Sequence, residues 1–138
     1  MFKSQLEERI YNTIKKLYPY FTVKTQMPLK NIVSEKVPAN LRRTTVDIFI
    51  PELKIAIEID GEHHFQEVSY GGDVEAKVNF EKRRRLDIAK ENFLYDNGVP
   101  LIRLSYSDIR NKNDTELVQF LSSMIHSTIQ EYFGGVIK

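Results

Sequence analysis

The sequence has no cysteine and no tryptophan among its 138 residues. Without cysteine the chain can have no disulfide scaffold, thiol nucleophile, iron–sulfur cluster or cysteine-based zinc site. No apolar run approaches the roughly 20 residues that a membrane-spanning helix needs. The N-terminal residues MFKSQLEERI lack the apolar core of a signal peptide. We therefore expect no zinc, no membrane partner and a cytoplasmic location.

Neither sign of charge is in excess, because 20 lysines and arginines balance 19 aspartates and glutamates. Such a chain is not a general polycation, so any binding of nucleic acid requires a local basic patch. Hydrophobic residues make up 41% and charged residues 28%, which is typical of a globular protein. The length predicts a single domain over residues 1–138.

Hydrophobic periodicity predicts an α/β fold with a small mixed sheet flanked by helices. A first helix is predicted from Ser4 to about Tyr18, and Ser4 has the S-x-x-E spacing of a capping box to Glu7. The Pro51-Glu52 break between two β-branched runs predicts a hairpin. The predicted order is αβββαβα, with strands at residues 20–27, 44–50, 53–60 and 100–104 and further helices at 74–96 and 115–133.

Acidic residues interrupt the two strongest strand patterns. Asp47 lies within TTVDIFI, and Glu58 and Asp60 lie within LKIAIEID. Across a hairpin these carboxylates can share one face, where they repel each other unless a proton or a cation lies between them. A hard divalent cation such as Mg²⁺ would remove the repulsion, although a solvated sheet face would accommodate the acids equally well. Their position directly before His63 and His64 favours a site.

Glu7 and the two histidines each allow two interpretations. Glu7 borders the apolar stripe of the first helix, so its carboxylate either caps the helix or points into a cleft. His63 and His64 are a weak indication of zinc, because adjacent residues of an extended segment point opposite ways. A single histidine that acts as an acid or base fits better, and a solvated loop histidine is the plain alternative.

A run of four cationic residues lies in the middle of the long predicted helix. Asp87 and Lys90 follow this run along the chain. Such runs are usually solvated ion-pair ladders. Beside a carboxylate cluster, however, consecutive cations suit a phosphate ester. We therefore expect DNA contacts at Lys82, Arg83, Arg84 and Arg85.

Together these stretches resemble the PD-(D/E)xK, or restriction-endonuclease-like, superfamily. Within it they are most similar to the branch of very-short-patch-repair-like and phage-type homing nucleases with the EDxHD signature. The resemblance covers about residues 4–110 and leaves the C-terminal helix at about 115–133 outside the core. It rests on the order and spacing of S-x-x-E at 4–7, VDIFIPELKIAIEIDGEHH at 46–64, YGG at 70–72, KRRRLDIAK at 82–90 and NGVPLIRLSY at 97–106.

The resemblance implies a restriction-endonuclease-like core and a role for each matching residue. Asp47 and Glu58, with the backbone carbonyl of Ile59, would bind Mg²⁺ or Mn²⁺. His64 would act as general acid or base, and the products would carry 5′-phosphates. The implied catalytic residues are Glu7, Asp47, Glu58, His64, Asp87 and Lys90.

The sequence departs from the superfamily at some positions. Asp60 stands where a lysine usually follows the second acid, which fits the histidine-using branch. Without tryptophan, base stacking would need Phe65 or Tyr70, and without cysteine the structural zinc of the repair enzymes is absent. We expect a metal-dependent DNA endonuclease that nicks or cuts both strands. A catalytically inactive DNA-binding module or subunit and a nuclease for RNA or branched DNA are the alternatives.

The size of the chain also bears on its partners. A domain of 138 residues has little spare surface for recognising a long DNA site. We therefore expect a homodimer, a larger complex or low sequence specificity.

Overall fold

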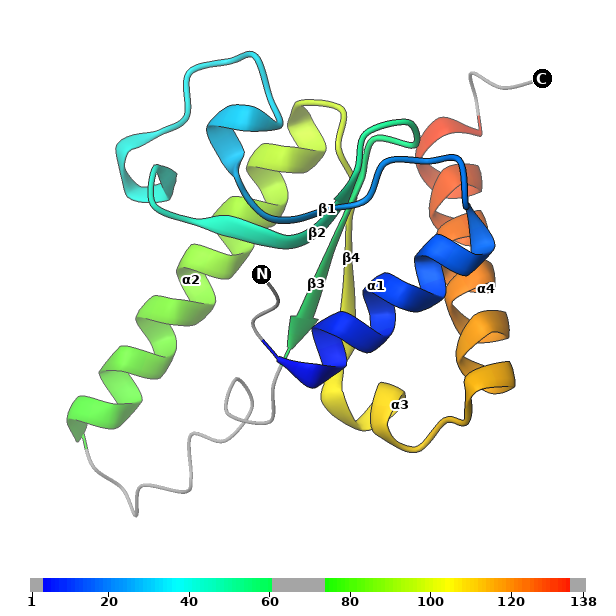
Figure 1. Ribbon diagram of the computed structural model, residues 1–138. Helices are drawn as coiled ribbons and strands as arrows, with labels where there is room; N and C mark the ends of the chain where they lie inside the picture. The colour runs from blue at the N-terminus through cyan, green and yellow to red at the C-terminus, as the bar shows by residue number, and fades with distance from the viewer. Residues whose placement is uncertain (1–3, 61–73, 135–138) are drawn as a thin grey trace.

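A four-stranded mixed sheet lies at the centre of the protein (Figure 1). The computed structural model describes residues 4–60 and 74–134. Strands β1 (Lys24–Pro28), β2 (Thr45–Ile50) and β3 (Ile55–Asp60) are antiparallel neighbours, and β4 (Leu101–Ser105) pairs with β3 in parallel. The α/β architecture with a small mixed sheet is therefore confirmed.

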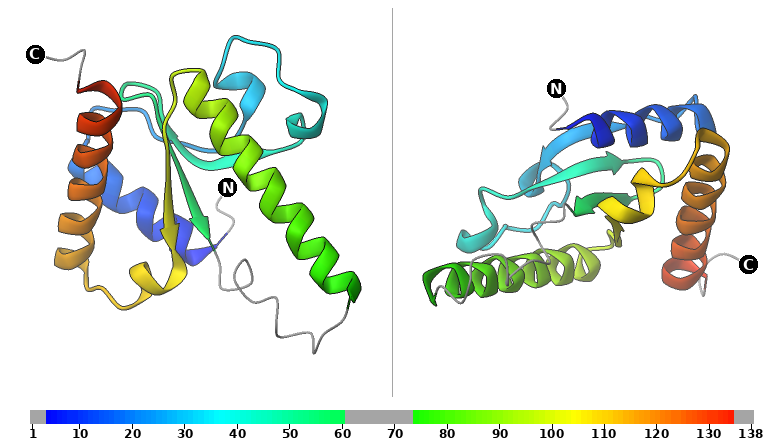
Figure 2. Two further views of the ribbon diagram at one scale, coloured as in Figure 1. Left: turned by 180° about the vertical axis from the view of Figure 1, so that it is seen from behind. Right: turned by 90° about the horizontal axis from the view of Figure 1, so that it is seen from below.

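Helices cover both faces of the sheet (Figure 2). Helices α1 (Gln5–Leu17) and α4 (Asp114–Phe133) bury their apolar stripes against the isoleucines of β2 and β3, and α2 (Val74–Asp96) packs on the opposite face. The first core holds Ile10, Ile14, Ile48, Ile57, Leu117 and Leu121, and the second holds Phe49, Ala56, Leu94 and Val99. Two separate apolar cores thus hold the sheet between the helices.

Several element boundaries differ from the prediction. The first strand begins at Lys24 and not at residue 20, because the chain turns after α1, where Phe21 N donates to Tyr18 O at 3.1 Å. The hairpin is confirmed, but its turn spans residues 51–54, with Lys54 at φ 53°. Sequence reasoning missed α3 (Tyr106–Arg110) and two short 3₁₀ helices, η1 (Leu29–Asn31) and η2 (Ala39–Leu41).

The N-terminal half of helix α2 extends well beyond the sheet, as Figure 1 shows. Its C-terminal half packs closely, with Lys90 and Leu94 buried, whereas residues 81–85 are all exposed. The exposed half therefore brings its side chains beside the ends of β3 and β4 without being part of a core. Within the described residues, no helix is long and apolar enough to cross a membrane.

Candidate active site

A row of polar residues crosses the sheet. In the antiparallel register Ile48 pairs with Ile57, so the next pair outward is Asp47 and Glu58. The same continuation places Gln26 of β1 opposite Asp47, and Glu58 pairs directly with Arg103 of β4. Residues that are paired across neighbouring strands point to the same face. The sheet thus aligns four polar side chains on the face that α2 covers.

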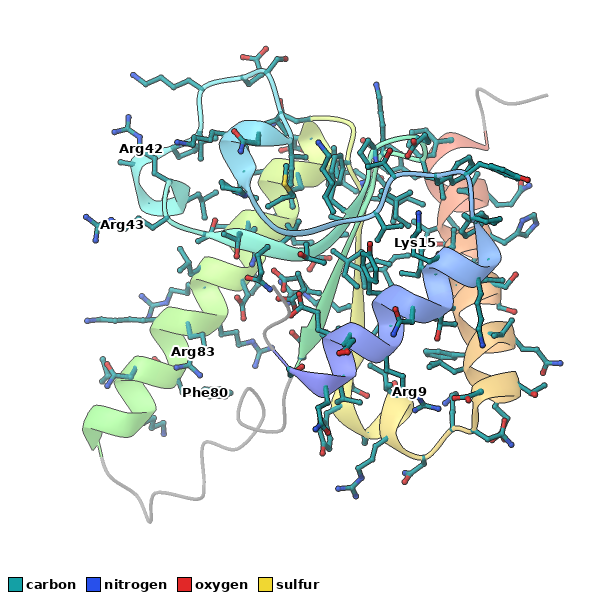
Figure 3. The ribbon with its side chains drawn as sticks, in the orientation of Figure 1. Arg9, Lys15, Arg42, Arg43, Phe80 and Arg83 are labelled. Atoms are coloured by element: carbon teal, nitrogen blue, oxygen red, sulfur yellow. The ribbon has the colours of Figure 1, made fainter. Side chains whose placement is uncertain are left out.

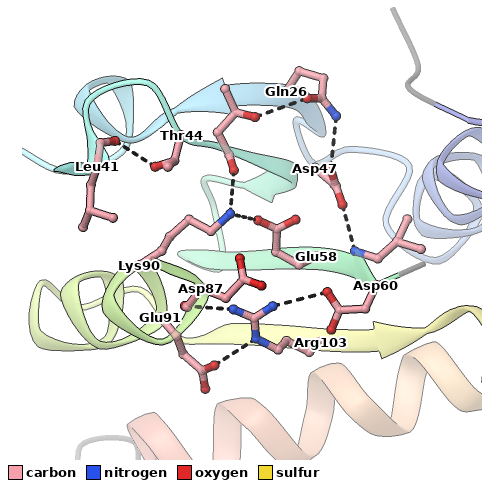
Figure 4. Close-up of polar contacts among 12 residues, drawn as sticks. Gln26, Leu41, Thr44, Asp47, Glu58, Asp60, Asp87, Lys90, Glu91 and Arg103 are labelled. Carbon is pink, nitrogen blue, oxygen red and sulfur yellow. Dashed lines mark hydrogen bonds and ion pairs between the residues drawn. The ribbon is translucent and has the colours of Figure 1, made fainter. Parts of the chain in front are cut away.

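Asp47 is held by hydrogen bonds to both of its oxygens (Figure 4). The residue is 4% exposed. Oδ2 accepts from the backbone N–H of Ile59 at 2.8 Å, and Oδ1 accepts from Nε2 of Gln26 at 3.1 Å. A buried carboxylate needs such donors, because its desolvation is otherwise costly. The orientation of Asp47 is therefore determined by two neighbouring strands.

Glu7 joins this group from the first helix. Ser4 caps α1, and its hydroxyl oxygen accepts from the backbone N–H of Glu7 at 3.1 Å. The Glu7 side chain is 1% exposed, and both carboxylate oxygens accept from Nε2 of Gln26 at 3.1 Å. Ser4 therefore caps the helix, while the Glu7 carboxylate lies in the interior beside Asp47.

Gln26 connects these two carboxylates. Its amide donates to Glu7 and to Asp47, while its own oxygen accepts from the Thr45 hydroxyl at 3.2 Å. Gln26 also has φ 50°, in the left-handed region that non-glycine residues rarely adopt. Such a conformation costs about 1 kcal/mol and is retained where the surrounding contacts require it. The strained backbone is thus used to direct an uncharged donor between two acids.

Glu58 and Lys90 form a buried ion pair. Lys90 Nζ donates to Glu58 Oε1 and, at 3.0 Å, to the backbone oxygen of Thr45. Burial raises the pKa of Glu58 to about 8, and the charge of Asp47 and a hydrogen bond to it act in the same direction, against the lowering effect of Lys90. Two carboxyl groups that raise each other's pKa, as Asp47 does that of Glu58, hold either a proton or a cation between them.

A second polar group lies at the end of β3. Arg103 donates to Asp60 at 3.3 Å, to Glu91 at 3.0 Å and to the backbone oxygen of Asp87 at 2.9 Å. Asp60 is 7% exposed. Asp60 is therefore neutralised by an arginine from the neighbouring strand. Lys90 supplies the only cation bonded to Glu58 among the described residues.

The basic run of α2, residues 82–85, is exposed. Arg85 pairs with Glu81 one helical turn away at 3.7 Å. In the described part of the chain, Lys82, Arg83 and Arg84 have no ion-pair partner, so the run is not a complete ladder. Figure 3 shows Arg83 on the side of α2 that faces the rest of the molecule.

The structure thus brings together most of the predicted residues that it describes. Gln26 connects Glu7 to Asp47, and Asp47 contacts Glu58, which is paired with Lys90. The backbone oxygen of Asp87 belongs to the neighbouring group around Arg103. The expected contacts of His64 and Phe65 lie outside the described residues, as do His63 and Tyr70.

Sequence reasoning missed Gln26 and Arg103. A charged residue within the apolar strand PLIRL was a signal of the same kind as Asp47 and could have identified Arg103. Gln26 carried no such signal, because its role depends on strand register and on an unusual backbone angle.

The carboxylate oxygens of this group are the type of ligand that a hard divalent ion prefers, but they are few. Among residues 4–60 and 77–134, no group of three acidic, histidine or cysteine side chains is arranged to hold a metal ion. Mg²⁺, however, needs only one or two carboxylates, since water and substrate oxygens complete its shell. Asp47 and Glu58 are two such carboxylates, and their mutual repulsion is what a cation would relieve.

Comparisons with family models, with curated proteins and with solved structures produced no match to this chain. The resemblance to restriction-endonuclease-like proteins thus rests on the sequence motifs alone.

Proposed function

We propose that this protein is a Mg²⁺- or Mn²⁺-dependent DNA endonuclease with a restriction-endonuclease-like core. The proposal is supported chiefly by the contact between Asp47 and Glu58. These two buried carboxyl groups come from neighbouring strands, and burial together with the charge of Asp47 disfavours the ionised form of Glu58. Glu7 adds a third acid through Gln26. A fold does not need such a group for its stability, since replacing a whole buried charged group by apolar residues is often neutral or stabilising.

The side chains have separate tasks in phosphodiester hydrolysis. Asp47, Glu58 and the Ile59 carbonyl would hold the metal ion, which supplies Lewis acidity and a bound water of lowered pKa. Gln26 orients Asp47, and Lys90 orients Glu58 and offsets charge that develops on the phosphate. Arg83 and Arg84 bind the DNA backbone. His64 would move the proton to or from the reacting oxygens, as the motif implies.

One observation favours a second candidate, a DNA-binding module without catalysis. Both oxygens of Asp47 and one of Glu58 already have hydrogen-bond donors within the protein. A chain that never binds a metal would keep this arrangement permanently. The two candidates differ in whether the carboxylates change partners when a divalent cation is added.

Plasmid nicking separates the two candidates. The protein is incubated with supercoiled plasmid and Mg²⁺ or Mn²⁺, and the relaxed and linear forms are quantified. We expect nicking by the parent and a loss of at least about 100-fold in Asp47→Asn, because one oxygen ligand is replaced by an amide. Asp96→Asn, at an exposed aspartate near the end of α2, is the matched control. No nicking by the parent, or equal nicking by Asp47→Asn, would contradict the proposal.

A further inference from the structure

A pocket of about 290 Å³ lies beside the carboxylate group, between α2 and the ends of β3 and β4. Phe80, Arg83, Arg84 and Asp87 line it from the helix, and Asp60 and Arg103 line it from the strands. The helical residues recur at three- and four-residue steps, so they form one stripe along α2. Figure 3 shows Phe80 and Arg83 on the same side of that helix.

The pocket has a polar floor and a cationic rim. At the floor, the two acids Asp60 and Asp87 lie beside one cation, Arg103, which donates to Asp60 and to the Asp87 backbone oxygen. At the rim, Arg83 and Arg84 are exposed and have no ion-pair partner in the described part of the chain. A lone phosphate would therefore bind at the rim and be repelled from the floor.

Phe80 supplies a third kind of contact. Its ring is half-buried on the pocket wall, and the half-exposed Ile88 lies on the same wall. An aromatic ring beside guanidinium groups is the usual surface on which proteins stack bases of single-stranded nucleic acid. The floor carboxylates would accept hydrogen bonds from amino groups at the base edge. The volume of about 290 Å³ lies just below the usual range of small-ligand pockets, which suits a ligand of about one nucleotide.

From this arrangement we infer that the pocket binds one unpaired nucleotide of the substrate, with its base on Phe80 and its phosphates at Arg83 and Arg84. The inference rests on the proposed DNA-cleaving function and specifies its substrate: DNA in which a single-stranded segment adjoins a duplex. A base inside a duplex is covered by its neighbours and cannot reach Phe80.

Fluorescence anisotropy tests this assignment. Two labelled DNAs are compared in EDTA, a short duplex with an unpaired tail on one strand and the same duplex with blunt ends. We expect the parent to bind the tailed DNA roughly 5- to 150-fold more tightly, the range given by stacking of one base. Phe80→Ala and Phe80→Leu should abolish the difference, and Phe80→Tyr should keep it. Arg85→Ala, outside the pocket, should weaken both DNAs equally.

Two results would overturn the pocket assignment. One is equal affinity of the parent for tailed and blunt DNA, and the other is full tail preference in Phe80→Leu, which keeps apolar bulk but lacks a ring. Neither result touches the nuclease proposal, because plasmid nicking is measured separately. Conversely, a tail preference without cleavage of either the plasmid or the tailed DNA in Mg²⁺ or Mn²⁺ would retain the pocket and reject the nuclease.

Discussion

Replacing Gln26 by leucine would remove the donor that joins two buried acids while keeping a side chain of similar size. Nε2 of Gln26 donates to Glu7 and to Asp47 at 3.1 Å each. A hydrogen bond to a charged group contributes about 1.5–3 kcal/mol, and loss of the donor leaves the desolvated acceptors without that partner. We therefore expect the free energy of unfolding to fall by about 3–5 kcal/mol, out of the roughly 5–15 kcal/mol typical of a domain.

Urea denaturation followed by circular dichroism measures this change. Lys54→Leu is the matched control, because Lys54 also has a left-handed φ, of 53°, but its side chain is exposed in a turn. We expect Lys54→Leu to change the unfolding free energy by no more than about 0.5 kcal/mol. A loss below about 1 kcal/mol in Gln26→Leu, or equal losses in the two variants, would refute the role assigned to the amide.

Three further outcomes follow from the same contacts. Burial and Asp47 raise the pKa of Glu58 to about 8, so the folded state binds this proton more tightly than the unfolded state does. The stability that the proton contributes is complete below the ordinary carboxyl pKa and is lost as the pH rises through about 8. Chemical denaturation across this range should show the free energy of unfolding falling with pH in the parent and falling less in Glu58→Gln. Lys90→Met should lower the unfolding free energy by about 3 kcal/mol at alkaline pH, where Glu58 is ionised, and by less at acidic pH; adding Glu58→Gln should restore much of the loss in the same assay. The double change Arg83→Ala with Arg84→Ala should reduce the salt dependence of DNA binding by about two phosphate contacts, measured as the slope of log affinity against log salt, and an unchanged slope would exclude both arginines from the interface.

Much of the fold could be predicted because its signals are local. The helix expected at residues 74–96 has those bounds, and the two central strands and the final helix agree to within two residues. The two strands and the final helix have the apolar patterns that packed elements require, whereas the end of the helix at 74–96 is marked by the stop signal Asn97-Gly98. Asp47 and Glu58 stood out for the same reason, since a charge within an apolar strand breaks the pattern visibly.

The remaining features depend on residues far apart in the sequence. Lys90 meets Glu58 only because α2 packs on the sheet, and Gln26 meets Glu7 only because the fold brings the edge strand β1 beside the start of α1. The early part of the first predicted strand was wrong because an apolar run formed a turn, with the Tyr18 and Phe21 rings stacked. Local patterns identified the acids of the site but not the neutral amide that holds two of them together.

Binding of Mn²⁺ to the protein tests most directly whether Asp47 and Glu58 form a cation site. Electron paramagnetic resonance distinguishes free from bound Mn²⁺, so titrating the parent, Asp47→Asn and Asp96→Asn gives the affinity of each without any DNA. We expect the parent and Asp96→Asn to bind Mn²⁺ alike and Asp47→Asn to lose that binding. Equal binding by all three proteins, or none by the parent, would contradict the account.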